Sequence, residues 1–410
     1  MYDTSKNYKI YIKEPSRMFE SKIVLGERTF KNDDVIQLNI ETQQPNSGFS
    51  IGSTISKSIE LTLKNDRETY ASVGIIDISL GLKIGEAIEY IKQGIFNIDV
   101  VTKTDYTVKI TAYDNMIKFE MPYSEKYSNP TLNQVIQQLQ SITGVEFDSS
   151  VSIPNYTLSK LSGYTCREIL GYVASLMGGN AYITRDGKFT IVTPIEVDYT
   201  VTSNNYWDYD IEDNTYKIGM LTCQNKVKND AVDESDDYEA IKEKNTISVG
   251  SLGTDNMELT FINPWMTETI LNSIYNKLKA FSFLGYSVKW QGDLSVDVGD
   301  IINVIDKHGI TRKAFVFSDK IRYNGGLTQE TSAKGQTKSS NKFSTTDSPT
   351  EMDRISVKLL LAEKAIIQKA NISDLTAVSA KVGDLQVSVA TINTALVNYA
   401  TIDNLNATNI

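Results

Sequence analysis

Cysteine and histidine are scarce in this chain of 410 residues, which has two cysteines, Cys166 and Cys223, and one histidine, His308. Two cysteines cannot form the disulfide framework of a small secreted domain. One histidine excludes zinc sites built from several histidines and most catalysis by a histidine base. Because neither cysteine has a cysteine or histidine nearby in the sequence, we expect both to be buried as small apolar side chains.

Long apolar runs are also missing. No stretch of 18 apolar residues occurs, so the sequence predicts no membrane span, and the first 16 residues lack the apolar segment of a signal peptide. We therefore expect a soluble protein made in a cytoplasm, which uses no cofactor and no metal.

The chain has fewer positive than negative side chains, with 41 Lys and Arg residues against 51 Asp and Glu residues, which gives a net charge of −10. This balance argues against a protein whose main task is to hold a nucleic-acid backbone. The length suggests two to four domains, and 40% hydrophobic residues allow several modest cores. With 22 Tyr and 13 Phe, the composition favours a β-rich fold.

Alternating apolar and polar residues predict that the first part of the chain, 1–120, is a β-barrel. Short strands bounded by turn residues are typical of a barrel or a sandwich. The expected strands cover 9–12, 35–40, 58–63, 94–101 and 106–113.

Helical periodicity replaces this alternation in 121–205, which we expect to be a small α/β module. A first helix is expected to start with Asn129-Pro130 as N-cap and first helical residue and to end at Gly144. A second helix starts with a capping box of Thr165 and Glu168. A hairpin over 181–192 follows, with Arg185-Asp186-Gly187-Lys188 as its turn.

The remaining chain is expected to contain a second barrel, a linker and a coiled coil. The second barrel covers 206–325, with a helical insertion at about 231–283 in which Asn263-Pro264 is the helix cap. Ser, Thr and Lys dominate 326–350, which is typical of a polar linker, and 351–410 is the predicted coiled coil.

An apolar seam with steps of three and four residues runs through the predicted coiled coil. β-Branched residues at both core positions of its heptads favour a trimer, which makes this seam the predicted trimerisation site. The alternative is one amphipathic helix packed against the chain's own body. The chain ends without a terminating signal, so we expect a longer natural protein. The seam residues are Leu375, Val378, Val382, Leu385, Val389, Ile392, Leu396 and Tyr399.

A catalytic motif is suggested only by 48–52 (GFSIG), which matches the G-x-S-x-G nucleophile elbow of hydrolases around Ser50. That elbow needs a strand before it and a helix after it, whereas a polar stretch precedes this motif and a strand-like run follows it. The only histidine base would be His308, in a predicted polar turn. Glycines that bend a barrel edge are the favoured interpretation.

Two acidic clusters could hold calcium, although neither fits an EF-hand loop, and solvated acidic loops are the favoured interpretation. Trp207, Trp265 and Trp290 could serve a carbohydrate site, but they lie far apart in the sequence. The clusters comprise Asp208, Asp210, Glu212 and Asp213, then Asp230, Asp233, Glu234, Asp236, Asp237 and Glu239.

Five stretches, in this order and spacing, resemble the phage tail hub family, the tail-associated, tail-spike or tail endopeptidase-type proteins of Gram-positive phages and tail-like particles. The likeness covers roughly 20–330. The stretches are 48–63 (GFSIGSTISKSIELTL), 109–114 (KITAYD), 164–188 (YTCREILGYVASLMGGNAYITRDGK), 298–304 (VGDIINV) and 321–327 (IRYNGGL).

The resemblance implies a fold that is mainly β with α+β parts: two tail-tube-like barrels, the α/β module and a C-terminal trimeric coiled coil. It implies a homotrimeric hub at the virion tail tip or baseplate, made in the host bacterial cytoplasm, that joins a sixfold tube to a threefold tip or fibre. The implied partners are the distal tail or tube protein, the tape measure protein, further baseplate or fibre proteins, and DNA only in transit through the channel.

Two other functions stay open at this point. A peptidoglycan-degrading enzyme would need a carboxylate pair or a catalytic part beyond residue 410. A receptor-binding fibre protein would need an exposed aromatic groove. We expect no enzymatic activity from the chain itself.

Overall fold

The computed structural model describes residues 1–43, 49–67, 70, 74–225, 246–253 and 256–334. The predicted coiled coil, its seam and most of the predicted linker lie outside the described residues, as does the second acidic cluster. Among the helices that are described, none is both long and apolar enough to cross a membrane.

The first β unit follows a short helix, α1 (Lys6–Tyr11). The strand predicted at 9–12 is wrong, because the Ser5 side chain accepts a hydrogen bond from the Tyr8 amide and caps a helix instead. Tyr8 and Ile12, four residues apart, are both buried by the helical turn. The strands of this unit are β1 (Phe19–Leu25), β2 (Arg28–Phe30), β3 (Val35–Gln43), β4 (Ser56–Lys64), β5 (Ile75–Ile84), β6 (Ala87–Lys103) and β7 (Thr107–Tyr113).

The α/β module contains a 3₁₀ helix, η1 (Asn115–Glu120), the helices α2 (Leu132–Thr143) and α3 (Cys166–Leu176), and the hairpin β8 (Asn180–Ile183) and β9 (Phe189–Val192). The capping box at Thr165 and the hairpin are confirmed. Gly144 ends α2 with a φ of 68°, as expected. The predicted cap at Asn129 is wrong, because Thr131 and Gln134 form a capping box two residues later.

The second β unit has one helix, α5 (Glu268–Leu278), capped by Thr267 rather than by Asn263. The Asn263 amide instead donates to the Tyr172 carbonyl and to the Ser175 hydroxyl of α3. The strands are β10 (Ile195–Val201), β11 (Tyr206–Gln224), β12 (Thr246–Gly250), β13 (Asn256–Ile262), β14 (Ser282–Trp290), β15 (Asp300–Ile305), β16 (Thr311–Phe315), β17 (Ser318–Tyr323) and β18 (Leu327–Ala333).

Strand β18 corrects the predicted linker, whose first residues form a ladder between β14 and β17. The segment has few apolar residues, but every second side chain, from Leu327 through Gln329 to Ala333, is buried. The Gln329 amide is satisfied inside the core, since it donates to Asp319 and accepts from the Asp293 amide.

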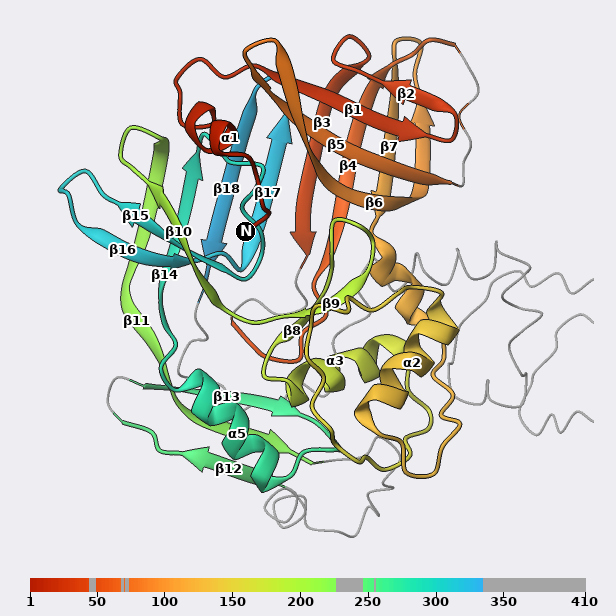
Figure 1. The fold of residues 1–410 in the computed structure, drawn as a ribbon, viewed down its shortest axis with the longest axis vertical. Helices are drawn as coiled ribbons and strands as arrows, with labels where there is room; N and C mark the ends of the chain where they lie inside the picture. The colour runs from red at the N-terminus through yellow and green to blue at the C-terminus, as the bar shows by residue number, and fades with distance from the viewer. Residues whose placement is uncertain (44–48, 68–69, 71–73, 226–245, 254–255, 335–410) are drawn as a thin grey trace, which may run out of the picture.

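Two separate barrels were expected, whereas the described strands form one open 13-stranded sheet in the order β12-β11-β14-β18-β17-β3-β4-β7-β6-β5-β1-β2, with β13 also paired to β11. The reason is an antiparallel pairing of β17 with β3, which joins an edge of one unit to an edge of the other (Figure 1). A three-stranded sheet, β10-β15-β16, and the β8-β9 hairpin are separate from it.

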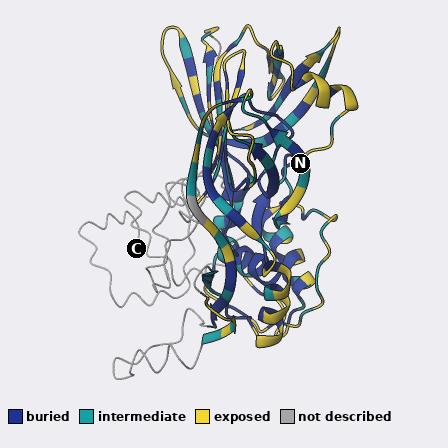
Figure 2. Cartoon of the chain, turned by 90° about the vertical axis from the view of Figure 1, so that its left-hand side faces the viewer, coloured by how far each residue is buried: buried dark blue, intermediate teal, exposed yellow. Residues whose placement is uncertain are grey.

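Two apolar cores lie beside this sheet, one in the first unit and one shared by the module and the second unit. Ile321 and Tyr323 of β17 and Leu327 of β18 pack in the first core, although they come from the second half of the chain. Figure 2 shows buried residues running through both units and exposed residues at the hairpin ends. The predicted domain limits stay a prediction.

Candidate functional site

The residues of the hydrolase motif do not form a catalytic site in the described structure. Ser50 is buried, its hydroxyl lies 2.6 Å from the Ser53 hydroxyl, and the segment leads into strand β4 rather than into a helix. His308 is in the exposed turn between β15 and β16. The predicted barrel-edge role of the glycines is also wrong for Gly52, which lies against Gly171 and Ser175 of α3.

The other candidate residues are dispersed. Asp208, Asp210 and Glu212 lie on β11, and no group of three metal-ligating side chains exists among the described residues. Cys166 and Cys223 are buried as expected, and burial raises the pKa of the Cys223 thiol to about 12.

The three tryptophans do not form a common surface. Trp207 is 61% exposed, whereas Trp265 and Trp290 are buried in the core. A carbohydrate groove built from all three is therefore excluded.

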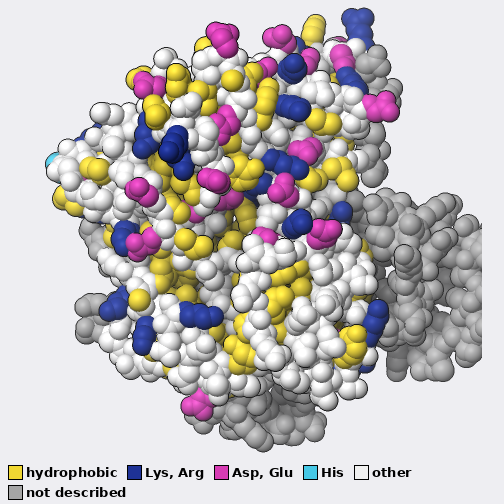
Figure 3. All heavy atoms as spheres, viewed as in Figure 1, with side chains coloured by type: hydrophobic (Ala, Val, Ile, Leu, Met, Phe, Trp, Pro, Cys, Tyr) yellow, Lys and Arg dark blue, Asp and Glu magenta, His cyan; other side chains and the backbone are white. Residues whose placement is uncertain are grey.

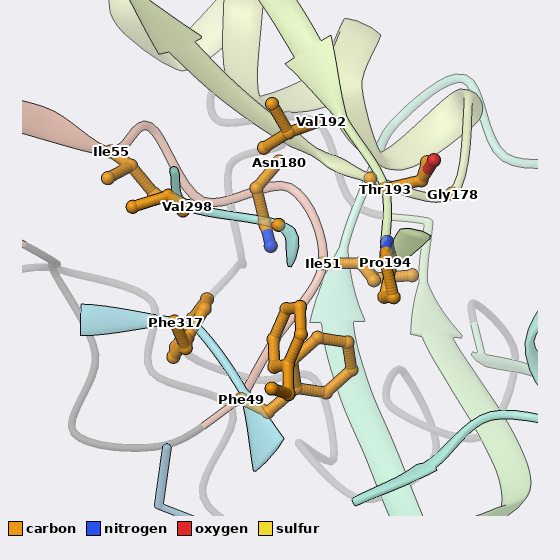
Figure 4. Close-up of a pocket in the computed structure, with 13 residues that line it drawn as sticks. Phe49, Ile51, Ile55, Gly178, Asn180, Val192, Thr193, Pro194, Val298 and Phe317 are labelled. Atoms are coloured by element: carbon orange, nitrogen blue, oxygen red, sulfur yellow. The ribbon is translucent and has the colours of Figure 1, made fainter. Parts of the chain in front are cut away.

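An apolar pocket lies where the segment before β4 meets the β8-β9 hairpin and β16 (Figure 4). Phe49 lies at its base, with its ring centroid 5.5 Å from that of Phe315 and 5.7 Å from that of Phe317. The amide of Asn180 is hydrogen-bonded at both its nitrogen and its oxygen, because it donates to the Ser50 carbonyl and accepts from the Ser53 amide. These contacts indicate that the pocket is part of the packing interface between the module and the β units rather than a ligand site.

A buried polar junction ties the module to both β units. Arg185, in the β8-β9 turn, donates to the carbonyls of Lys92 (3.1 Å), Leu294 (2.6 Å) and Val296 (3.0 Å). Its Nε lies 2.9 Å from Oδ2 of Asp297. Four of the five N–H groups of the guanidinium therefore donate to an oxygen, which is the geometry that makes a buried arginine tolerable.

Asp297 is the anion of this junction, and it also accepts a 2.6 Å hydrogen bond from the Tyr182 hydroxyl. The Lys57 ammonium lies 3.8 Å from Asp297 and 4.7 Å from the centre of the Tyr182 ring. Burial alone would raise the pKa of Asp297, but Arg185 and Lys57 outweigh it and hold that pKa well below its usual range.

Two further carboxyls in this region show the opposite effect. Burial raises the pKa of Asp319 to about 7, although Gln329 donates a hydrogen bond to it. Burial also raises the pKa of Asp114 to about 7, although its carboxylate accepts from the amides of Lys57 and Met116. Burial therefore shifts the pKa values of Asp114 and Asp319 in the direction opposite to that of Asp297.

One face of the continuous sheet is polar across both units. Strand alternation places its side chains opposite the buried residues of the same strands. Pairing registers then align one row of charges of alternating sign across five strands: Asp208 of β11, Lys289 of β14, Glu330 of β18, Lys320 of β17 and Glu41 of β3. We call this row the charge ladder.

The charge ladder is open to solvent. Lys320 and Glu41 approach to 2.7 Å with side chains 42% and 48% exposed, and Lys289 and Asp208 approach to 4.0 Å with 56% and 58% exposed. Glu330 lies directly between the two lysines in the ladder. Cross-strand neighbours of opposite charge contribute about 0.2–1 kcal/mol each to the free energy of unfolding, so the row adds little to the stability of the protein.

Neighbouring positions on the same face are polar as well. Arg322 lies between Asn39 and Thr328, and Lys109 pairs with Glu60 at 3.3 Å on β7 and β4. Figure 3 shows hydrophobic side chains gathered in the lower half of that view, where the α/β module lies.

The comparisons with known proteins give a likeness of fold only. No protein-family model and no curated protein matches the sequence. The solved structures that are similar include the 43 kDa tail protein of prophage MuSo2 from Shewanella oneidensis, with 13% identity, a TM-score of 0.46, and coverage of 77% of this chain and 98% of that one.

Two further similar structures are a tail protein from Neisseria meningitidis MC58 and the prophage tail protein gp18 from Listeria monocytogenes. The first has 12% identity, a TM-score of 0.47 and coverage of 77% and 95%; the second has 11% identity, a TM-score of 0.46 and coverage of 78% and 95%. With every TM-score below 0.5, these likenesses assign neither a family nor a function to this chain.

Proposed function

We propose that the chain is a structural subunit of a phage tail hub, located at the tail tip or baseplate of a virion or tail-like particle. Three copies would form a homotrimeric adaptor between a sixfold tail tube and a threefold tip or fibre, and would line the channel through which DNA passes. Its neighbours would be the distal tail or tube protein, the tape measure protein and further baseplate or fibre proteins. The chain would have no enzymatic role of its own.

The pairing of β3 with β17 is the observation that carries this proposal. It sets two antiparallel units edge to edge within one chain, through four paired positions from Leu38 with Tyr323 to Glu41 with Lys320. Main-chain hydrogen bonds fix the orientation of the two units, so three chains would present six units in a ring. The polar face then runs without interruption from one unit to the next.

The mass in solution tests the proposal. We expect light scattering on the purified chain to give three times the 45.7 kDa mass of one chain. Mixing with the tube protein should cap the tube at one end, which negative-stain electron microscopy would show. A monomer that does not cap tubes at any concentration would refute the hub.

A zymogram on purified cell wall tests the absence of enzymatic activity. We expect no clearing by the purified chain. Clearing that disappears when a carboxylate pair is replaced would instead establish a glycosidase.

A further inference from the structure

We infer that the carboxylates of the charge ladder, Asp208, Glu330 and Glu41, mask Lys289 and Lys320 against the phosphates of DNA. The inference rests on the proposed function, because it gives the polar face the task of letting DNA pass without holding it. It goes further by naming the residues that keep the face from binding.

The first step is geometric. Each lysine of the ladder has a carboxylate on both neighbouring strands: Lys289 lies between Asp208 and Glu330, and Lys320 lies between Glu330 and Glu41. Adjacent strands are about 4.8 Å apart, so both neighbours are within the reach of a lysine side chain. Two of these contacts are present, at 2.7 Å and 4.0 Å.

The second step is electrostatic. A phosphate that approaches either lysine also approaches two carboxylates within one Debye length, which is about 10 Å at 0.1 M salt. The row carries three negative and two positive charges, and Arg322 lies two residues from Lys320 on the same face, so the three carboxylates cancel the attraction of these three cations for a polyanion. Since the side chains of the two ion pairs in the row are about half exposed, DNA can approach the row closely enough to interact with its charges.

Without the three carboxylates, Lys289 of β14 joins Lys320 and Arg322 of β17 in an exposed cationic strip that spans the intervening strand β18. Such a strip is the ordinary basis of sequence-independent binding to a phosphate backbone. With the three carboxylates present, DNA is expected to pass this face without binding; without them, the same face is expected to bind DNA.

The test uses the full chain with Asp208→Asn, Glu330→Gln and Glu41→Gln, which keep shape and remove charge. Binding of a fluorescein-labelled DNA duplex is measured by anisotropy between 25 and 200 mM salt. We expect roughly tenfold or tighter binding than by the parent chain at low salt, with a slope of log affinity against log salt of about −2.7 for three cations.

A matched control neutralises three exposed carboxylates in turns away from the face: Glu27→Gln, Glu86→Gln and Asp105→Asn. Both variants change the net charge by three, so only position distinguishes them. Equal DNA affinity of the two variants would overturn the inference, because net charge alone would then explain binding. Thermal unfolding of both variants verifies that they are folded.

A second variant identifies the cations. Adding Lys289→Gln and Lys320→Gln to the ladder variant is expected to return DNA affinity to the parent level. Binding that persists would overturn the assignment to these lysines. This result is independent of the test of oligomeric state. If the chain is a trimer and the ladder variant binds DNA no better than the control, the proposed hub stands and the masking inference is wrong. If the chain is a monomer and the ladder variant gains DNA binding, the masking inference stands and the proposed hub is wrong.

Discussion

Replacing Arg185 with leucine tests whether the buried junction holds the module and the β units together. The change leaves Asp297 with Lys57 and the Tyr182 hydroxyl, and it removes the donors to the carbonyls of Lys92, Leu294 and Val296. Leu294 and Val296 are fully buried, so water cannot easily replace the guanidinium there.

The expected cost follows from these contacts. Breaking a buried ion pair costs about 3–5 kcal/mol, and each buried acceptor left without a donor costs about 1–3 kcal/mol. The two costs overlap, and the Asp297 side chain keeps 23% of its surface exposed. We therefore expect a loss of roughly 4 kcal/mol, which is a large part of the 5–15 kcal/mol that typically stabilises a folded protein.

Urea unfolding followed by tryptophan fluorescence measures this loss, since Trp265 and Trp290 are buried. Lys109→Leu is the matched control, because it removes an exposed ion pair and should change stability by less than about 0.5 kcal/mol. If Arg185→Leu is too unstable to purify, Arg185→Lys keeps the charge, loses the planar set of donors, and should give an intermediate loss.

A change of less than about 1 kcal/mol for Arg185→Leu would refute the reasoning, because Arg185 would then not be the group that satisfies these oxygens. A large loss for the control as well would also count against it, since surface charge rather than the junction would then govern stability.

Three further predictions concern other parts of the chain. Because the pKa of Asp319 is raised to about 7 when folded, the folded state holds a proton that the unfolded state releases above about pH 4. The contribution of this group to stability is therefore full below pH 4 and is lost as pH rises to 7. Asp319→Asn should flatten that part of the stability profile in urea titrations from pH 5 to 8; an unchanged profile would contradict the assignment. Gly171→Ala should destabilise the protein by roughly 1–3 kcal/mol, although alanine normally favours a helix, because the new Cβ would lie 2.7 Å from the Gly52 carbonyl oxygen; a gain in melting temperature would show that the two segments can separate. Val382→Asp with Leu385→Asp should lower the mass in light scattering from three chains to one, and a persistent trimer would disprove the predicted seam.

Local patterns in the sequence were sufficient for the elements whose side chains satisfy their own backbone. Thr165 and Glu168 begin a helix, Gly144 ends one, and the Asp186-Gly187 turn closes a hairpin, all as predicted. The same logic failed where a nearer residue offered a better cap, as Thr131 does beside Asn129.

The functional surface was harder to predict, because it depends on residues far apart in the chain. Lys320 and Arg322 at alternate positions in 318–323, and the polar Thr328, Glu330 and Ser332 at alternate positions in 327–333, were usable signs of exposed strand faces. Segment 327–333 was nevertheless assigned to a linker for lack of apolar side chains. Arg185 was identified only as a turn residue, since nothing local indicates that its turn enters a buried junction.

The sequence by itself determined the β-rich class, the amphipathic helices and the burial of both cysteines, because these follow from periodicity and from contacts within a few residues. Only the tertiary structure decided that β3 pairs with β17, which opened the expected barrels into one sheet. The charge ladder and the Arg185 junction depend on that pairing and on packing between distant segments. Register between strands hundreds of residues apart is fixed by the whole core, and no local pattern encodes it.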